Sequence, residues 1–96
     1  MENQHRKITG YRELTQTEVD LMNRVKALGE DIEILLQSVS KHIESQRFEG
    51  KTDKEQADIT QRHQNATPER CLVLAKIEMQ TGLMYATRAV AQPEFF

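Results

Sequence analysis

Residues 14–48 constrain the fold most strongly, because their pattern predicts one long amphipathic helix. Thr15-Gln-Thr-Glu18 has the form of a capping box, in which Thr15 accepts a hydrogen bond from a first-turn amide and Glu18 reaches back to the amide of Thr15. Apolar residues then recur at steps of three and four: Leu21, Val25, Leu28, Ile32, Leu35 and Val39, with His42 in the next place. A neighbouring row consists of Met22, Gly29, Leu36 and Ile43. One stripe cannot bury itself, so this helix needs partners.

A second helix is predicted over residues 67–92, with Thr67 as its N-cap, Pro68 in its first position and Pro93 beyond its end. Its first apolar stripe, expected to pack against the long helix, is Leu72, Ala75, Met79, Leu83, Ala86 and Val90. Its second stripe is Val73, Ile77 and Met84. We expect this second stripe, like Ile34 on the long helix, to contact a neighbouring chain. Gly82 is expected to mark a close helix crossing.

The remaining residues form two polar segments. Residues 1–13 are interpreted as a basic arm, and residues 49–66 as a polar connector that begins with Gly50 as a left-handed helix stop and holds at most one helical turn, around 54–59. The expected fold class is therefore all-α: a single domain over residues 1–96, built as a long two-helix hairpin with an N-terminal arm. A chain of 96 residues buries a thin core, so we also expect a homo-oligomer.

Composition excludes several classes of function. A net charge of -2 argues against a general DNA or RNA binder, and the lone Cys71 excludes an internal disulfide. The three widely spaced histidines form no metal-ligand pattern. No stretch is apolar enough for a membrane span or a signal peptide, so a cytoplasmic location is expected. The sequence contains no catalytic motif or glycine-rich phosphate loop, so we expect a binding protein rather than an enzyme, without a cofactor.

Two places in the chain suggest anion or nucleotide contacts. Tyr11 and Arg12 set an aromatic ring beside a guanidinium shortly before the helix cap, a pairing that suits a nucleobase with its phosphate. The alternative for this region is a solvated basic tail. Lys26 follows the core position Val25 and lies outside the main stripe. On pattern alone its role is solubility, with Glu30 as a partner four residues on.

Three blocks of the sequence resemble a known family in their residues and in their order. They are the opening Asn3-Gln-His-Arg-Lys-Ile-Thr-Gly-Tyr-Arg-Glu-Leu14, the middle Leu21-Met-Asn-Arg-Val-Lys-Ala27, and the closing Gln80-Thr-Gly-Leu-Met84 with Thr87-Arg-Ala-Val-Ala-Gln-Pro93. The chain is similar here to the anti-CBASS sponges of bacteriophages, small proteins that bind the cyclic oligonucleotide messengers of a bacterial immune system. The resemblance covers the arm and both helices, but not residues 49–66.

The resemblance implies helical-hairpin protomers assembled into a hexamer in the host cell cytoplasm. Cyclic dinucleotides of the cGAMP kind would lie between pairs of protomers without turnover, with Tyr11 stacked on a base and Lys26 at a phosphate. Some members also hold cyclic trinucleotides at a separate site. Arg70 matches the place of a contributing arginine there, whereas Leu28 stands where a polar contact is expected.

The residues leave three other interpretations open. Related sponges that inhibit Thoeris defence bind cyclic ADP-ribose-type signals, and nothing in these blocks excludes that ligand class. A phosphodiesterase would cleave the messenger instead of holding it. A purely structural helical oligomer or adaptor would bind no nucleotide at all.

Overall fold

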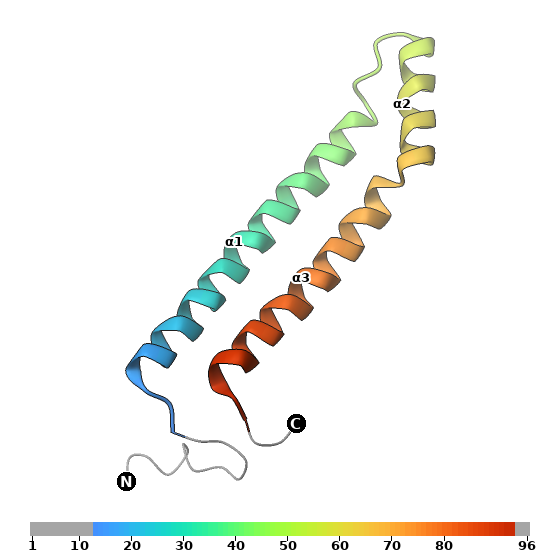
Figure 1. The fold of residues 1–96 in the computed structure, drawn as a ribbon. Coiled ribbons are helices and arrows are strands. Elements are labelled where there is room, and N and C mark those ends of the chain that lie inside the picture. The colour runs from blue at the N-terminus through green and yellow to red at the C-terminus, as the bar shows by residue number, and fades with distance from the viewer. Residues whose placement is uncertain (1–12, 94–96) are drawn as a thin grey trace. The chain divides into compact units, whose positions relative to one another are not determined.

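The computed structural model describes residues 13–93, and this part of the chain contains three helices (Figure 1). Helix α1 spans Gln16–Gln46, α2 spans Asp53–Ala66 and α3 spans Pro68–Ala91. These residues contain no strand, in agreement with the predicted all-α class. The arm predicted over residues 1–13, with Tyr11 and Arg12, lies outside the described residues except for Glu13.

The capping box predicted at the start of α1 is confirmed in both directions. The amide of Glu18 donates to Thr15 Oγ1 at 3.2 Å, and the amide of Thr15 donates to Glu18 Oε1 at 2.8 Å. Two of the amides that a helix start leaves without a partner are thereby satisfied.

The end of α1 differs from the prediction. The amides of Arg47, Phe48 and Glu49 donate to carbonyls three residues earlier, at 3.1 to 3.2 Å, which tightens the last turn. Gly50 does not have the left-handed backbone expected of a helix stop. It is required by crowding instead, because a Cβ there would lie 2.7 Å from the backbone of Gln56.

Helix α2 is the main departure from the sequence prediction, which allowed one helical turn in the connector. It runs for 14 residues, none of them buried. Its first turn is capped by Thr52, whose Oγ1 accepts from the amide of Glu55 at 3.1 Å. Lys54 and Asp58 pair at 3.3 Å one turn apart. Caps and local pairs therefore support this helix in place of an apolar stripe.

Thr67 joins α2 to α3 in a left-handed conformation, with φ 43° and ψ 59°. Its amide donates to the carbonyl of His63 at 2.9 Å, and its carbonyl accepts from the amide of Cys71 at 3.1 Å. Thr67 thus closes one helix and begins the next. An ordinary N-cap has extended backbone, so the cap predicted for Thr67 is wrong in conformation, although α3 begins at Pro68 as expected.

The contacts within the chain define two compact units, and the first comprises, among the described residues, 13–30 and 80–93. In its described part the beginning of α1 lies beside the end of α3. The two helices approach closely at Gly29, where an added Cβ would lie 3.2 Å from Leu83 Cδ1. At Gly82, predicted to mark the close crossing, no atom of the described residues other than the local helix backbone lies within 4 Å of such a Cβ. That prediction is wrong, because Gly82 lies on a different face of α3 from Leu83.

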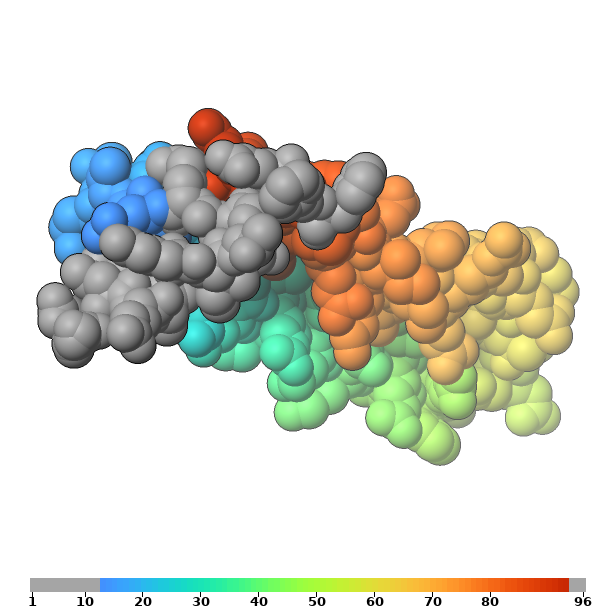
Figure 2. Space-filling view, turned by 90° about the horizontal axis from the view of Figure 1, so that it is seen from below, coloured from blue at the N-terminus to red at the C-terminus, as the bar shows by residue number. Residues whose placement is uncertain are grey.

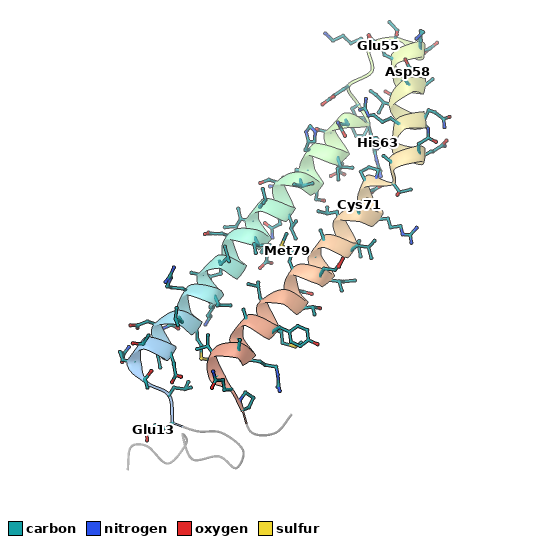
Figure 3. All side chains as sticks on the ribbon, in the orientation of Figure 1. Glu13, Glu55, Asp58, His63, Cys71 and Met79 are labelled. Carbon is teal, nitrogen blue, oxygen red and sulfur yellow. The ribbon has the colours of Figure 1, made fainter. Side chains whose placement is uncertain are left out.

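The second unit comprises residues 31–79 and holds Ile43, which is the one buried side chain among the described residues, at 6% exposed. Polar contacts join its elements. His63 of α2 bonds through Nε2 to Gln46 Oε1 of α1 at 3.1 Å (Figure 3). Arg47 pairs with Glu69 of α3 at 2.6 Å, and its carbonyl accepts from the side chain of Gln56 at 2.9 Å.

The apolar residues of α1 face differently from the prediction. The row taken as the main stripe includes Leu21, Leu28 and Leu35, which are 38%, 53% and 58% exposed. The inward positions are Met22, Val25, Gly29, Ile32, Leu36 and Ile43. These follow the spacing of a heptad seam, which leaves the residue before Met22, Gly29 and Leu36 on an adjacent face.

On α3 the two predicted stripes do separate by exposure. The inner stripe is half-buried at Leu72, Ala75, Leu83 and Val90, whereas Met79 is 42% exposed and Ala86 is also exposed. The outer stripe of Val73, Ile77 and Met84 is 51 to 59% exposed. Figure 2 shows atoms of α3, in orange, at the surface in the middle of that view.

Candidate functional site

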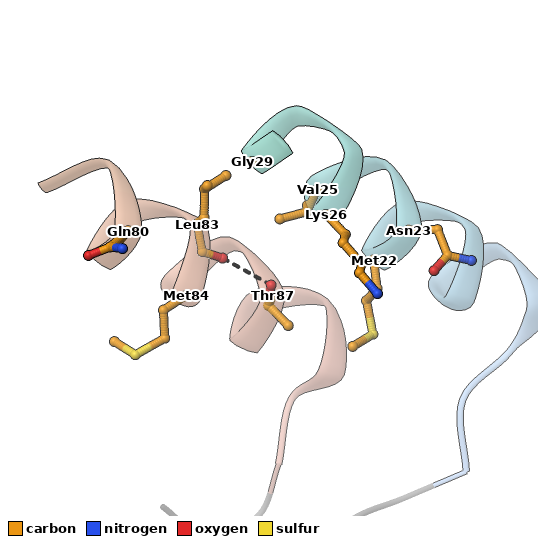
Figure 4. A pocket seen from close by; sticks show the side chains of 9 residues that line it. All are labelled: Met22, Asn23, Val25, Lys26, Gly29, Gln80, Leu83, Met84 and Thr87. Carbon is orange, nitrogen blue, oxygen red and sulfur yellow. Dashed lines mark hydrogen bonds between the residues drawn. The ribbon is translucent and has the colours of Figure 1, made fainter. Parts of the chain in front are cut away.

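A pocket of about 450 Å³ lies within the first unit, between α1 and α3 (Figure 4). Its lining from α1 is Met22, Asn23, Val25, Lys26 and Gly29, and its lining from α3 is Gln80, Leu83, Met84 and Thr87. This volume is in the range of small-molecule sites, about 300 to 1,000 Å³. The middle and closing sequence blocks therefore meet at this pocket.

The apolar base of the pocket follows from the seam between the two helices. Val25 and Leu83 point inward from opposite helices, and Leu83 reaches toward Gly29, which has no side chain to obstruct it (Figure 4). Thr87 donates its hydroxyl to the carbonyl of Leu83 at 2.9 Å. The Thr87 hydroxyl is thus fixed within α3 and presents only acceptor capacity to a ligand.

Lys26 contributes the positive charge of the pocket. It lies one turn after Met22 on α1, and its side chain runs along the same wall (Figure 4). The ion pair predicted with Glu30 does not form, and no carboxylate between residues 13 and 93 lies within 4 Å of the Lys26 ammonium. A long stem that lines a pocket while its charged end stays in solvent is suited to contact an anion at the rim.

Two side-chain amides, those of Asn23 and Gln80, complete the polar part of the lining. Both residues are exposed, and neither amide forms a hydrogen bond to any residue in the described part of the chain. Sequence reasoning did not single them out. Each lies inside a block that carries the family resemblance, but a lone amide on a polar helix face gives no periodic signal.

Arg70 and Leu28, which the sequence also singled out, do not line this pocket, and Tyr11 and Arg12 lie outside the described residues. Arg70 is exposed in the first turn of α3, within the second unit, and does not line the pocket. Leu28 is 53% exposed and also lies outside the lining. The structure therefore brings Lys26 into the pocket and leaves Arg70 apart from it.

Residues 13–93 offer neither a cluster of metal ligands nor a helix that could span a membrane. No group of three or more His, Cys, Asp or Glu side chains is placed to hold a metal ion there. Neither α1 nor α2 nor α3 is both long and apolar enough to cross a membrane.

Comparison with known proteins decides the family. The sequence model of the family described as Acb2/Tad1, hairpin domain, matches residues 3–91. The chain belongs to the Acb2/Tad1 hairpin family. The resemblance to anti-CBASS sponges that the three sequence blocks suggest is thereby confirmed at the level of the family.

A relative in the Acb2/Tad1 hairpin family is similar over almost its whole length. Anti-CBASS protein 2 of Pseudomonas phage JBD67 is 38% identical over an alignment of 106 positions, which spans 98% of this chain and 98% of the relative. The family match also includes Tyr11 and Arg12, and it runs through residues 49–66, for which the three blocks offered no counterpart.

Proposed function

We propose that this member of the Acb2/Tad1 hairpin family inhibits CBASS immunity in the host cell cytoplasm by binding cyclic dinucleotides and withholding them without cleavage. The observation that carries the proposal is the pocket of the first unit, where Lys26 has no ionic partner within residues 13–93 and lies beside apolar side chains. The name of the 38% identical phage relative, Anti-CBASS protein 2, supports the same biological role.

The chemistry of the pocket suits one half of a cyclic dinucleotide. The ammonium of Lys26 neutralises a phosphate without selecting a base, and the apolar base of the pocket covers part of the ring system. Tyr11, with Arg12 beside it, would add a stacking face from a second protomer. A ligand with near two-fold symmetry is matched by two protomers, because each supplies the same groups to one half.

Self-association is part of the proposal, with a hexamer as the assembly. Among the described residues, thirteen large apolar or aromatic side chains are at least 36% exposed and a single one is buried. The exposed set includes Ile34, Val73 and Ile77, which the sequence assigned to contacts between chains. Apolar surface of this kind on a small chain is typical of an interaction surface.

Titration calorimetry with 3′,3′-cGAMP tests the site. Lys26→Ala is expected to weaken binding by at least about tenfold, because a hydrogen bond to a charged group contributes about 1.5 to 3 kcal/mol. Lys41→Ala is the matched control, since Lys41 is an exposed lysine of the same helix outside the pocket. Equal affinities for the Lys26 and Lys41 variants would refute the role of Lys26. The absence of heat with wild type for every member of a panel of cyclic dinucleotides and cyclic ADP-ribose isomers would leave a structural oligomer.

Recovery of the ligand tests sequestration against catalysis. Protein loaded with 3′,3′-cGAMP and then heat-denatured is expected to release the intact cyclic molecule, as measured by liquid chromatography and mass spectrometry. Linear or cleaved nucleotide would instead identify a phosphodiesterase. A cyclic ADP-ribose isomer in the same experiment covers the other ligand class, and its exclusive retention would replace the dinucleotide proposal.

A second ligand site at Arg70 extends the proposal to cyclic trinucleotides. Arg70 is exposed in the first turn of α3, where the helix dipole adds to the attraction of an anion. Arg70→Ala should therefore weaken cyclic trinucleotide binding while leaving 3′,3′-cGAMP binding unchanged. An equal loss for both ligands would argue against a separate site.

A further inference from the structure

We propose that Asn23 and Gln80 read the edge of the bound base and favour adenine over guanine. This inference depends on the proposed function, because it assigns a selectivity to the same pocket. It concerns two residues that face one pocket from different helices, Asn23 from α1 and Gln80 from α3.

The amides of Asn23 and Gln80 make no hydrogen bond within residues 13–93 and are available to a ligand. Asn23 and Gln80 line a mostly apolar pocket, are exposed, and have no hydrogen-bond partner within residues 13–93. A ligand that fills the pocket takes water away from these amides, and an amide left without a partner then costs about 1 to 3 kcal/mol. Ligands whose polar atoms complement the amides are therefore favoured over ligands that leave them unpaired.

The donor and acceptor pattern of an amide matches the edge of adenine better than the edge of guanine. The side chains of Asn23 and Gln80 each offer one acceptor oxygen and one donor NH₂. The edge of adenine presents N7 as an acceptor and N6 as a donor, which an amide can contact with both groups at once. The same edge of guanine presents two acceptors, N7 and O6, which suit Arg or Lys. In the proposed complex the ammonium of Lys26 contacts a phosphate, so it does not donate a hydrogen bond to N7 or O6 of guanine.

The rest of the lining adds affinity without choosing a base. Met22 and Met84 extend from α1 and α3, and their flexible thioethers make favourable contacts with any aromatic ring. Val25 and Leu83 offer only apolar surface. The selectivity between adenine and guanine is therefore determined by the side-chain amides of Asn23 and Gln80.

Two symmetric ligands with identical phosphates isolate this effect: cyclic di-AMP and cyclic di-GMP. We expect calorimetry on the wild-type protein to show at least about fivefold tighter binding of cyclic di-AMP, since a bidentate base contact discriminates by about 1 to 3 kcal/mol. Asn23→Leu and Gln80→Met keep the approximate side-chain size but remove the amide. In the double variant the preference should shrink to within about twofold. Gln37→Met is the matched control, because Gln37 is an exposed glutamine of α1 outside the pocket.

Each result bears on one proposal or the other. Equal wild-type affinities, or a preference that survives in the double variant, would overturn the roles of Asn23 and Gln80. Failure of the wild type to bind either of these ligands or 3′,3′-cGAMP would overturn the proposed function instead. A cyclic di-AMP analogue with 7-deaza-adenine gives a test on the unaltered protein, because it removes the N7 acceptor. We expect its affinity to fall about fivefold or more, and an unchanged affinity would contradict base reading at that edge.

Discussion

A Cβ on Gly82 of α3 would have no atom of residues 13–93 within 4 Å apart from the local helix backbone, whereas a Cβ on Gly29 of α1 would lie 3.2 Å from Leu83 Cδ1. Gly82→Ala should therefore raise the free energy of unfolding by about 0.5 to 1 kcal/mol, because glycine weakens a helix interior by that amount. Gly29→Ala gains the same helix propensity but displaces Leu83 at the base of the pocket. Because Leu83 is displaced, we expect the Gly29→Ala variant to bind ligand more weakly than the wild type.

Urea denaturation and calorimetry on the two variants separate these effects. A Gly82→Ala variant that is less stable than wild type would contradict the open surroundings of Gly82 and would place a second copy of the chain over that residue. A Gly29→Ala variant that binds 3′,3′-cGAMP as tightly as wild type would show that the Gly29 side of the pocket base is not used by the ligand.

The residues of the pocket were only partly predictable from sequence. Lys26 could be selected because it occurs in a block with a family resemblance. Asn23 and Gln80 could not, since a polar residue on a helix surface is ordinary until the fold sets two of them around one cavity. The missing information is the contact between α1 and α3, which no local pattern contains.

Helix α2 depends on its cap more than on burial. Thr52 Oγ1 accepts from the amide of Glu55 at 3.1 Å, and no residue of α2 is buried. Thr52→Ala should therefore destabilise this helix by about 1 kcal/mol, the usual cost of losing an N-cap. Hydrogen exchange read by mass spectrometry on peptides from 53–66 is expected to be faster in the variant. Peptides from the middle of α1 serve as an internal control, and an equal change in both would indicate global rather than local destabilisation.

The prediction missed α2 because it relied on apolar periodicity, which residues 49–66 lack. A different signal was present: Thr52-Asp-Lys-Glu55 has the spacing of a capping box, and Lys54 stands four residues before Asp58. The structure uses both, although Glu55 Oε1 accepts from the amide of Lys51 at 3.0 Å. Caps and charge pairs are weaker signals than a stripe, since each contributes about 1 kcal/mol or less.

For the two long helices, α1 and α3, the sequence predicted that each helix exists but not which face of α1 packs against α3. Their existence followed from spacing and caps, and the capping box of Thr15 and Glu18 has the predicted bonds. Which apolar row of α1 faces inward did not follow. Steps of three and four residues fit both the row with Leu28 and the row with Gly29, and the partner helix chooses between them through the close approach of Leu83 to Gly29.

On the scale of the whole molecule, residues 13–93 leave more large apolar side chains exposed than they bury. Leu28 on α1 and Ile77 on α3 are 53% and 52% exposed, and Ile43 is the sole buried side chain between residues 13 and 93. Covering a leucine or isoleucine fully contributes about 1.5 to 3 kcal/mol. Association of two copies costs translational and rotational entropy. Contacts between copies would outweigh this cost only if they covered many such side chains together.

Charge placed on this surface should therefore separate the copies without unfolding them. Leu28→Glu and Ile77→Glu are expected to lower the mass measured by light scattering at micromolar concentration from that of an oligomer toward that of the 11.1 kDa chain. Helix content by circular dichroism should persist, because neither side chain is buried in the protomer. Ile43→Glu is the contrasting variant, since it places a charge at the buried position and should unfold the second unit. If the proposed site takes Tyr11 from one copy and Lys26 from another, dissociation must also abolish binding of 3′,3′-cGAMP. A wild-type chain that is monomeric and still binds this ligand would contradict the shared site.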